Sequence, residues 1–81
     1  MEKKEITEKV NNFLINEIEI DEKLIKPQAF LTHDLGIDSL DVIDIIVIVE
    51  QVFRVKIKGE ELRDVKTLQN FYDFIETKIN K

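Results

Sequence analysis

One serine stands where its hydroxyl could do chemistry. Ser39 follows the turn residue Gly36, lies between Asp38 and Asp41, and precedes a strongly apolar run over 42–53. The start of a helix offers free backbone N–H groups and the positive end of the helix dipole, which suit a phosphate or phosphodiester. We therefore interpret Ser39 as the attachment point of a covalent cofactor. An ordinary N-cap serine would give the same pattern, and spacing alone leaves both interpretations open.

Two other chemistries have weaker support. The single histidine, His33, could approach Ser39, but no glycine-rich oxyanion arrangement accompanies the pair. We interpret His33 as a surface histidine and the chain as a non-enzyme. Asp38 and Asp41 could hold a weak Ca²⁺ or Mg²⁺ site, but acids beside an apolar helix in so small a chain favour solvated carboxylates that face a partner. No metal site is predicted.

Composition limits the classes of protein that fit. The 81 residues include two glycines and one proline, and they are 43% hydrophobic and 36% charged. These values predict one folded domain over residues 1–81 with long elements. The absence of cysteine excludes disulfides and thiolate metal sites. No signal peptide is visible and the longest apolar run, Ile45 to Val49, is too short to span a bilayer, so we expect a cytoplasmic protein without membrane insertion.

Negative charge is concentrated in the centre of the chain. The net charge is −5. Residues 34–53 contain five acids and no base, whereas 1–33 sum to −2 and 54–81 to +2. This distribution favours a basic protein surface as partner and disfavours nucleic acid.

Apolar periodicity predicts an all-α protein. We expect helices over about 2–16, from 38 or 39 to 53 or 54, and after an N-cap at Thr67, plus one short helix over 59–65. The segment 17–33 is predicted to be a long ordered loop, pinned to the core by Leu24, Ile25, Phe30 and Leu31. Residues 55–58 alternate but lack a partner strand, so we expect an extended connection.

A helical wheel separates two faces of the second helix. The predicted core arc consists of Val42, Ile45, Ile46, Val49, Val52 and Phe53. The opposite arc holds Leu40, Asp41, Asp44, Ile48 and Gln51, with Ile43 and Val47 on a flank. The outer face therefore mixes acids with apolar residues that are unusual on a solitary protein. In the last helix, the predicted buried stripe is Leu68, Phe71, Phe74, Ile75 and Ile79.

The segment Asp34-Leu35-Gly36-Ile37-Asp38-Ser39-Leu40-Asp41 closely resembles the phosphopantetheine attachment motif of acyl carrier proteins. The resemblance continues through Glu50, Phe53 and Ile57 to the Thr67-Leu68 pair, and so covers the whole chain. It implies a right-handed bundle of three main helices plus one short helix, with a long loop after the first. It also implies that Ser39, flanked by Asp38 and Leu40, receives 4′-phosphopantetheine from coenzyme A and carries acyl chains as thioesters.

The resemblance further implies partners and surfaces. A phosphopantetheinyl transferase (holo-acyl carrier protein synthase) would load the chain, and ketosynthases, acyltransferases, reductases or dehydratases of fatty acid, lipid or polyketide biosynthesis would use it as a monomer. The implied partner-facing residues are Leu40, Asp41, Ile43, Asp44, Val47, Ile48, Glu50 and Gln51. The implied acyl-chain cavity is lined by Ile45, Ile46, Val49, Phe53, Leu62, Val65 and Phe71.

Three departures from the family's usual pattern suggest a specialised pathway. Gln51 stands where the family's second helix is more acidic, Ile48 replaces a small residue, and the segment 54–58 is basic where bulk fatty acid carriers have acids and a proline. We expect a more apolar docking surface as a result. Two alternatives stay open: a carrier for D-alanine or peptidyl amino acids, and a helical interaction module that has lost the cofactor.

Overall fold

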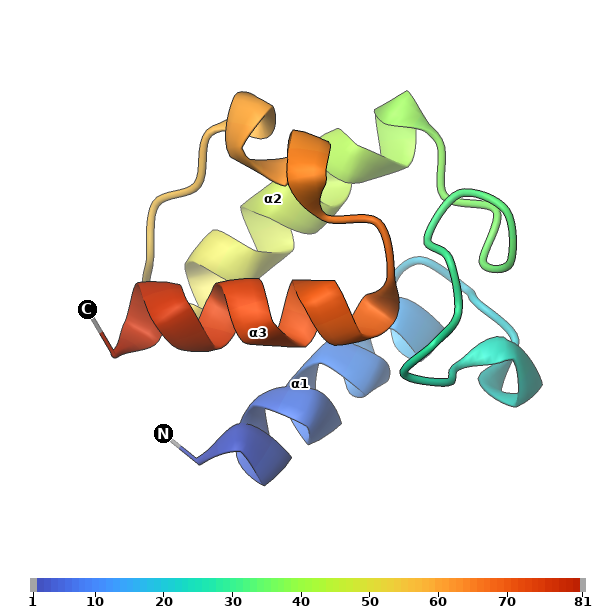
Figure 1. Cartoon of the computed structure of the whole chain (residues 1–81), viewed down its shortest axis with the longest axis horizontal. Helices are drawn as coiled ribbons and strands as arrows, with labels where there is room; N and C mark the ends of the chain where they lie inside the picture. The colour runs from blue at the N-terminus through green and yellow to red at the C-terminus, as the bar shows by residue number, and fades with distance from the viewer. Residues whose placement is uncertain (1, 81) are drawn as a thin grey trace.

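The chain folds as an all-α protein, as predicted. The computed structural model describes residues 2–80, which form α1 (Lys3–Asn16), the 3₁₀-helix η1 (Glu22–Leu24), α2 (Ser39–Phe53), the 3₁₀-helix η2 (Gly59–Asp64) and α3 (Leu68–Ile79). In Figure 1, α3 crosses in front of α1, while α2 lies behind η2 on the other side of α3. Across residues 2–80, the helices are too short or too polar to cross a bilayer.

Local backbone and side-chain geometry explains where α3 begins and where α2 ends. Thr67 caps α3 as predicted, because its Oγ1 accepts a hydrogen bond from the Asn70 N–H (3.2 Å) while Asn70 Oδ1 accepts from the Thr67 N–H (3.3 Å). At the C-terminal end of α2, Arg54 adopts the left-handed conformation with φ 57°. A non-glycine residue there costs roughly 1–2 kcal/mol, but it stops the helix and turns the chain into the extended connection predicted over 55–58.

The core combines all three main helices with four residues from the connections. Its buried members are Ile6, Val10, Phe13, Leu14, Ala29, Leu35, Ile37, Ile45, Val49, Phe53, Ile57, Leu68, Phe71, Tyr72 and Ile75. Val52, which the helical wheel placed in the core, is 39% exposed, so that assignment is wrong. Tyr72, which carries a side-chain hydroxyl, is buried although the predicted stripe of the last helix did not include it. It is buried because that hydroxyl donates a hydrogen bond to Asn11 Oδ1 on α1.

The predicted first loop exists, but two of its four expected anchors are wrong. Ile25 and Leu31 pack against the core, whereas Leu24 and Phe30 are 45% and 48% exposed. Ala29 is buried in their place. Side-chain size therefore misidentified which residues hold this loop to the helices.

Backbone hydrogen bonds, which side-chain periodicity did not reveal, hold the loop to the start of α3. The Leu31 N–H donates to the Lys66 carbonyl (3.0 Å), the Leu68 N–H to the Ala29 carbonyl (2.9 Å), and the Gln69 N–H to the Pro27 carbonyl (2.8 Å). Phe30 and Thr67 form an isolated antiparallel bridge between these bonds. These bonds fix the position of the loop relative to the start of α3.

A core truncation on α3 tests this packing. Ile75 is fully buried, so Ile75→Ala removes apolar contacts and leaves a cavity. We expect a loss of about 2–5 kcal/mol in the free energy of unfolding, measured by urea denaturation. The control Val47→Ala truncates a side chain that is 48% exposed and should change this quantity by less than about 0.5 kcal/mol. Equal losses in the two variants would contradict the assigned core.

Candidate functional site

Asp38, and not Ser39, caps α2. Asp38 Oδ1 accepts hydrogen bonds from the backbone N–H groups of Leu40 (2.9 Å) and Asp41 (3.0 Å), and Asp41 Oδ2 accepts from the Asp38 N–H (3.3 Å). Ser39 is the first residue inside the helix and is exposed. Its hydroxyl makes no hydrogen bond to any residue in 2–80. The alternative of an ordinary N-cap serine is therefore wrong, and the hydroxyl of the chain's only serine is free to react.

A tight turn presents Ser39 at a corner of the molecule. Gly36 has φ 69°, a conformation that side-chain-bearing residues rarely adopt, and a Cβ there would meet nothing within 4 Å. Glycine is thus needed for backbone geometry and not for space. The neighbours on each side, Leu35 and Ile37, are buried, and the Asp34 carboxylate accepts a hydrogen bond from the Phe30 N–H (2.7 Å). These contacts hold the turn rigidly against the core.

The cap changes what a phosphodiester on Ser39 would encounter. The sequence suggested free N–H groups at the helix start, but Asp38 already occupies those of the second and third helical residues. A phosphodiester there would lie beside this carboxylate and near Asp41. The corner is therefore strongly acidic once modified, and a basic partner surface would complement it.

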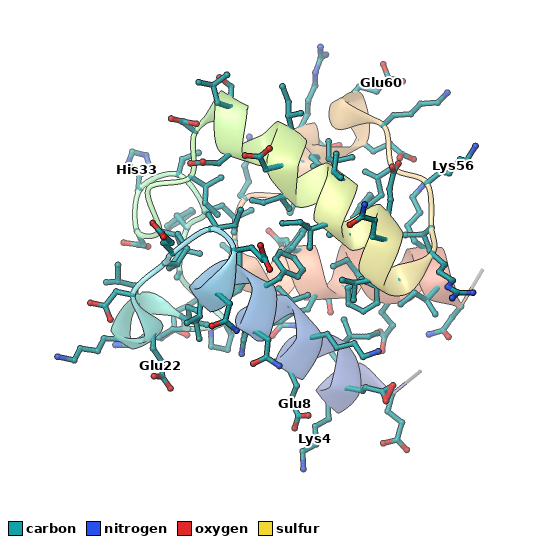
Figure 2. The ribbon with its side chains drawn as sticks, turned by 180° about the vertical axis from the view of Figure 1, so that it is seen from behind. Lys4, Glu8, Glu22, His33, Lys56 and Glu60 are labelled. Carbon is teal, nitrogen blue, oxygen red and sulfur yellow. The ribbon has the colours of Figure 1, made fainter. Side chains whose placement is uncertain are left out.

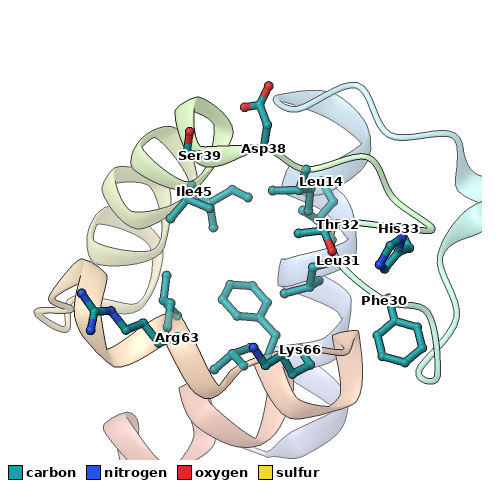
Figure 3. Close-up of a pocket in the computed structure, with 15 residues that line it drawn as sticks. Leu14, Phe30, Leu31, Thr32, His33, Asp38, Ser39, Ile45, Arg63 and Lys66 are labelled. Carbon is teal, nitrogen blue, oxygen red and sulfur yellow. The ribbon is translucent and has the colours of Figure 1, made fainter.

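A groove of about 560 Å³ opens beside Ser39. Figure 3 shows Asp38 and Ser39 on one rim, with Arg63 and Lys66 across the opening. Its walls are mostly apolar and come from every part of the fold: they are Leu14, Phe30, Leu31, Ile37, Val42, Ile45, Leu62, Val65 and Phe71, with Thr32 and His33 at one side. A groove that begins at an exposed serine can receive an apolar chain tethered to that serine.

Four of the seven cavity residues implied by the family resemblance line this groove, namely Ile45, Leu62, Val65 and Phe71. The other three do not, because Val49 and Phe53 are buried farther along α2 and Ile46 packs against the core. The sequence missed the contributions of Leu14, Leu31 and Ile37. They come from α1 and the first loop, and only tertiary packing brings them to the same opening. Val42 was already on the predicted inner arc.

An apolar strip follows the outer side of α2. It consists of Leu40, Ile43 and Val47, which are 73%, 60% and 48% exposed. Their spacing of three and four residues places them on one face of the helix. Asp44 is also exposed, and Asp41 is half-buried beside its capping contacts.

Two residues assigned to the outer face point elsewhere. The helical wheel is wrong for Ile48, which packs against the core and borders a shallow groove with Phe13 of α1. Glu50 is half-buried, and its Oε2 accepts a hydrogen bond from the Ile57 N–H (3.1 Å). The Glu50 carboxylate thereby ties the end of α2 to the extended connection. Gln51 is exposed as predicted.

The structure does not bring Ser39 and His33 together. The two lie at different sides of the groove in Figure 3, and the His33 ring packs edge-on against Phe30 with centroids 6.3 Å apart. His33 and Lys56 project near opposite ends of α2 in Figure 2. Within residues 2–80, no three His, Asp or Glu side chains gather closely enough to hold a metal ion.

An ion pair positions the η2 wall of the groove. Lys78 Nζ lies 2.6 Å from Glu61 Oε1 and 5.7 Å from the centre of the Phe74 ring. The pKa of Glu61 is lowered, first by a hydrogen bond from the Lys58 N–H (2.9 Å) and then by Lys78. These contacts attach η2 to α3, and so hold Leu62 and Val65 over the groove.

Comparisons with known proteins point to a single family. A family model described as a phosphopantetheine attachment site matches residues 8–75. An acyl carrier protein from Thermosynechococcus vestitus is 37% identical, with 98% of each chain covered. One from Coprothermobacter proteolyticus is 34% identical, over 98% of this chain and 96% of that one. The crystal structure of an acyl carrier protein from Thermotoga maritima is similar with a TM-score of 0.82 and 25% identity, over 99% of this chain and 93% of the other.

Substitutions at adjacent residues separate capping from attachment. Asp38→Ala removes the acceptor of two helix-start N–H groups and should lower the free energy of unfolding by about 1 kcal/mol. Ser39→Ala removes a hydroxyl without a partner in 2–80 and should change it by less than about 0.5 kcal/mol. Chemical denaturation of the unmodified proteins measures both. A loss at Ser39→Ala as large as that at Asp38→Ala would mean that the serine is structural.

Proposed function

This chain belongs to the acyl carrier protein family, and from that premise we propose that Ser39 is the residue to which its 4′-phosphopantetheine is attached. The protein is a non-catalytic carrier that holds acyl chains on phosphopantetheine. One observation supports the choice of residue. Asp38 caps α2, so Ser39 lies at the helix start with an exposed hydroxyl that makes no hydrogen bond within residues 2–80. Such a residue can be modified without disturbing the fold.

We propose that the groove beside Ser39 shelters the acyl chain. Ile45 and Phe71 are buried beneath it, while Leu62 and Val65 form the wall supported by the Glu61–Lys78 pair. Removing methylene groups from water contributes about 0.8 kcal/mol each when they are fully buried, which favours insertion of the chain over exposure. The cofactor's thiol supplies the thioester bond, while the protein supplies attachment, shelter and recognition.

We propose that partner enzymes dock on the outer side of α2. The apolar strip of Leu40, Ile43 and Val47 supplies contact area, and Asp41 and Asp44 supply charge that complements a basic surface. The partners are a phosphopantetheinyl transferase and acyl-processing enzymes. In this role the carrier is a cytoplasmic monomer.

We propose a specialised acyl or polyketide-type pathway instead of bulk fatty acid synthesis. The strip is strongly apolar, Glu50 is engaged within the chain, and Gln51 adds no charge, so the acidic surface of α2 ends early. Basic residues of the segment 54–58 follow it. Enzymes that require a long acidic surface should bind this carrier weakly, and efficient turnover by every housekeeping fatty acid synthase enzyme would contradict the proposal.

Two alternatives have less support. The relatives reported above are acyl carrier proteins, which favours an acyl cargo over D-alanine or peptidyl amino acids. A cofactor-free interaction module would keep the apolar strip but would have no use for a free serine beside a groove. The intact mass of the protein from its native host separates this module from a loaded carrier.

Loading tests the attachment site directly. Incubation with coenzyme A and a phosphopantetheinyl transferase should add the mass of one phosphopantetheine, located at Ser39 by peptide mass spectrometry. Ser39→Ala should receive none. Thr32→Ala is the control, because it removes another exposed hydroxyl beside the same groove and should leave loading intact. Modification of the Ser39→Ala protein would overturn the proposal.

The docking surface predicts unequal effects of two apolar truncations on α2. Ile43→Ala, in the strip, should lower kcat/KM for loading by the transferase about tenfold, equivalent to about 1.4 kcal/mol of transition-state stabilisation. Val52→Ala truncates an exposed residue outside the strip and should change kcat/KM by less than about twofold. Steady-state kinetics with varied carrier concentration measures both. Equal effects would place the docking surface elsewhere.

A further inference from the structure

The groove beside Ser39 has a positively charged rim that attachment of the cofactor does not explain. Arg63, within η2, and Lys66, just after it, both border the groove, and both are exposed. In Figure 3 they lie across the opening from Ser39. The floor between the two rims is apolar and includes Leu14 and Phe71. An arm that starts at Ser39 and crosses this floor brings its cargo to the side of the two cations.

Neither cation is neutralised within residues 2–80. The ion pairs found there join Lys3 to Asp73 and Lys78 to Glu61, and neither includes Arg63 or Lys66. Glu61 is fully engaged, because it also accepts the Lys58 N–H. The other acids of η2, Glu60 and Asp64, do not border the groove. Backbone contacts fix the rim itself, since the Lys66 carbonyl accepts a hydrogen bond from the first loop.

From this arrangement, and resting on the proposed attachment at Ser39, we infer that the groove selects acyl cargo with a carboxylate at its far end. The methylene groups of such a chain would cover the apolar floor, while the terminal carboxylate would pair with Lys66 and Arg63. Because both cations are at the rim, the carboxylate stays in contact with water and avoids the large cost of burying a charge. A chain that ends in a methyl group would leave both cations without a counterion.

The cofactor's phosphodiester is a second possible anion, but it is on the wrong rim. It would be bonded to Ser39 Oγ, next to the Asp38 carboxylate and across the opening from Arg63. The position of a cargo's far end depends on the length of the cargo, so it can reach the cations. The phosphodiester stays bonded to Ser39. The geometry therefore assigns the two cations to the cargo.

Matched cargoes on the same arm test this inference. The full chain is loaded with octanoyl-phosphopantetheine or with its ω-carboxylated counterpart of equal length, and intact mass confirms each product. At low salt, the carboxylated form should melt about 3 °C higher than the octanoyl form, as expected for solvent-exposed ion pairs in a domain of this size. The difference should shrink in 1 M NaCl, where the screening length is about 3 Å.

Charge-removal variants identify the residues responsible. The double variant Arg63→Gln/Lys66→Gln should abolish the difference between the two cargoes. The control Arg54→Gln/Lys56→Gln removes the same charges away from the groove and should preserve it. Comparing cargoes within each variant cancels any loss of stability caused by the substitutions themselves.

Each remaining outcome contradicts the inference in a recognisable way. Equal melting temperatures for the two cargoes in the unsubstituted chain would overturn it, as would a difference that survives the Arg63/Lys66 substitutions. A third outcome is that the two cargoes give equal melting temperatures in the unsubstituted chain and the Arg63/Lys66 substitutions lower both equally. That outcome would assign the cations to the phosphodiester. A chain that takes up no arm at Ser39 would overturn the proposed function together with this inference.

Discussion

Three backbone hydrogen bonds between the first loop and the start of α3 hold together the half of the molecule that contains the groove. A loop of this length in a small chain must satisfy many polar backbone groups, and here residues 27–31 do so on 66–69. The pairing buries Ala29 and places Leu31 in the groove wall. It also fixes the backbone of Lys66 at the rim. The groove is thus a consequence of backbone pairing as much as of helix packing.

At the start of α2, two adjacent residues differ in what their side chains do. Asp38 satisfies the backbone donors at the helix start, and Ser39, one residue later, is left exposed. A serine that capped the helix would have its oxygen engaged, and its modification would cost the cap. The Gly36 turn places both residues at a corner beside the groove. The same few residues therefore set the helix boundary and the accessibility of the hydroxyl.

Local rules predicted the main helices and the position of Ser39 at the start of α2, whereas the groove depended on packing that local rules do not describe. The sequence predicted the Thr67 cap, the limits of α2 and the extended connection, because each depends on neighbouring residues. Phe30 and Val52 were misassigned because apolar character alone does not decide burial. Tyr72 was missed because its burial requires Asn11, which is distant in sequence. The cations of the rim carried no sequence signal of their own.

The high apolar content of α2 is explained by what each side of the helix contacts. A helix that is apolar nearly all round is normally covered on every side. Here Val49 and Phe53 face the core, Ile45 lies under the groove, and Ile48 packs near α1. The chain itself covers these sides of α2. It leaves uncovered the strip of Leu40, Ile43 and Val47, and Val52 farther along the helix. The exposure of this strip to water is a cost that a docked partner would remove, and the neighbouring acids would keep the unbound carrier hydrated.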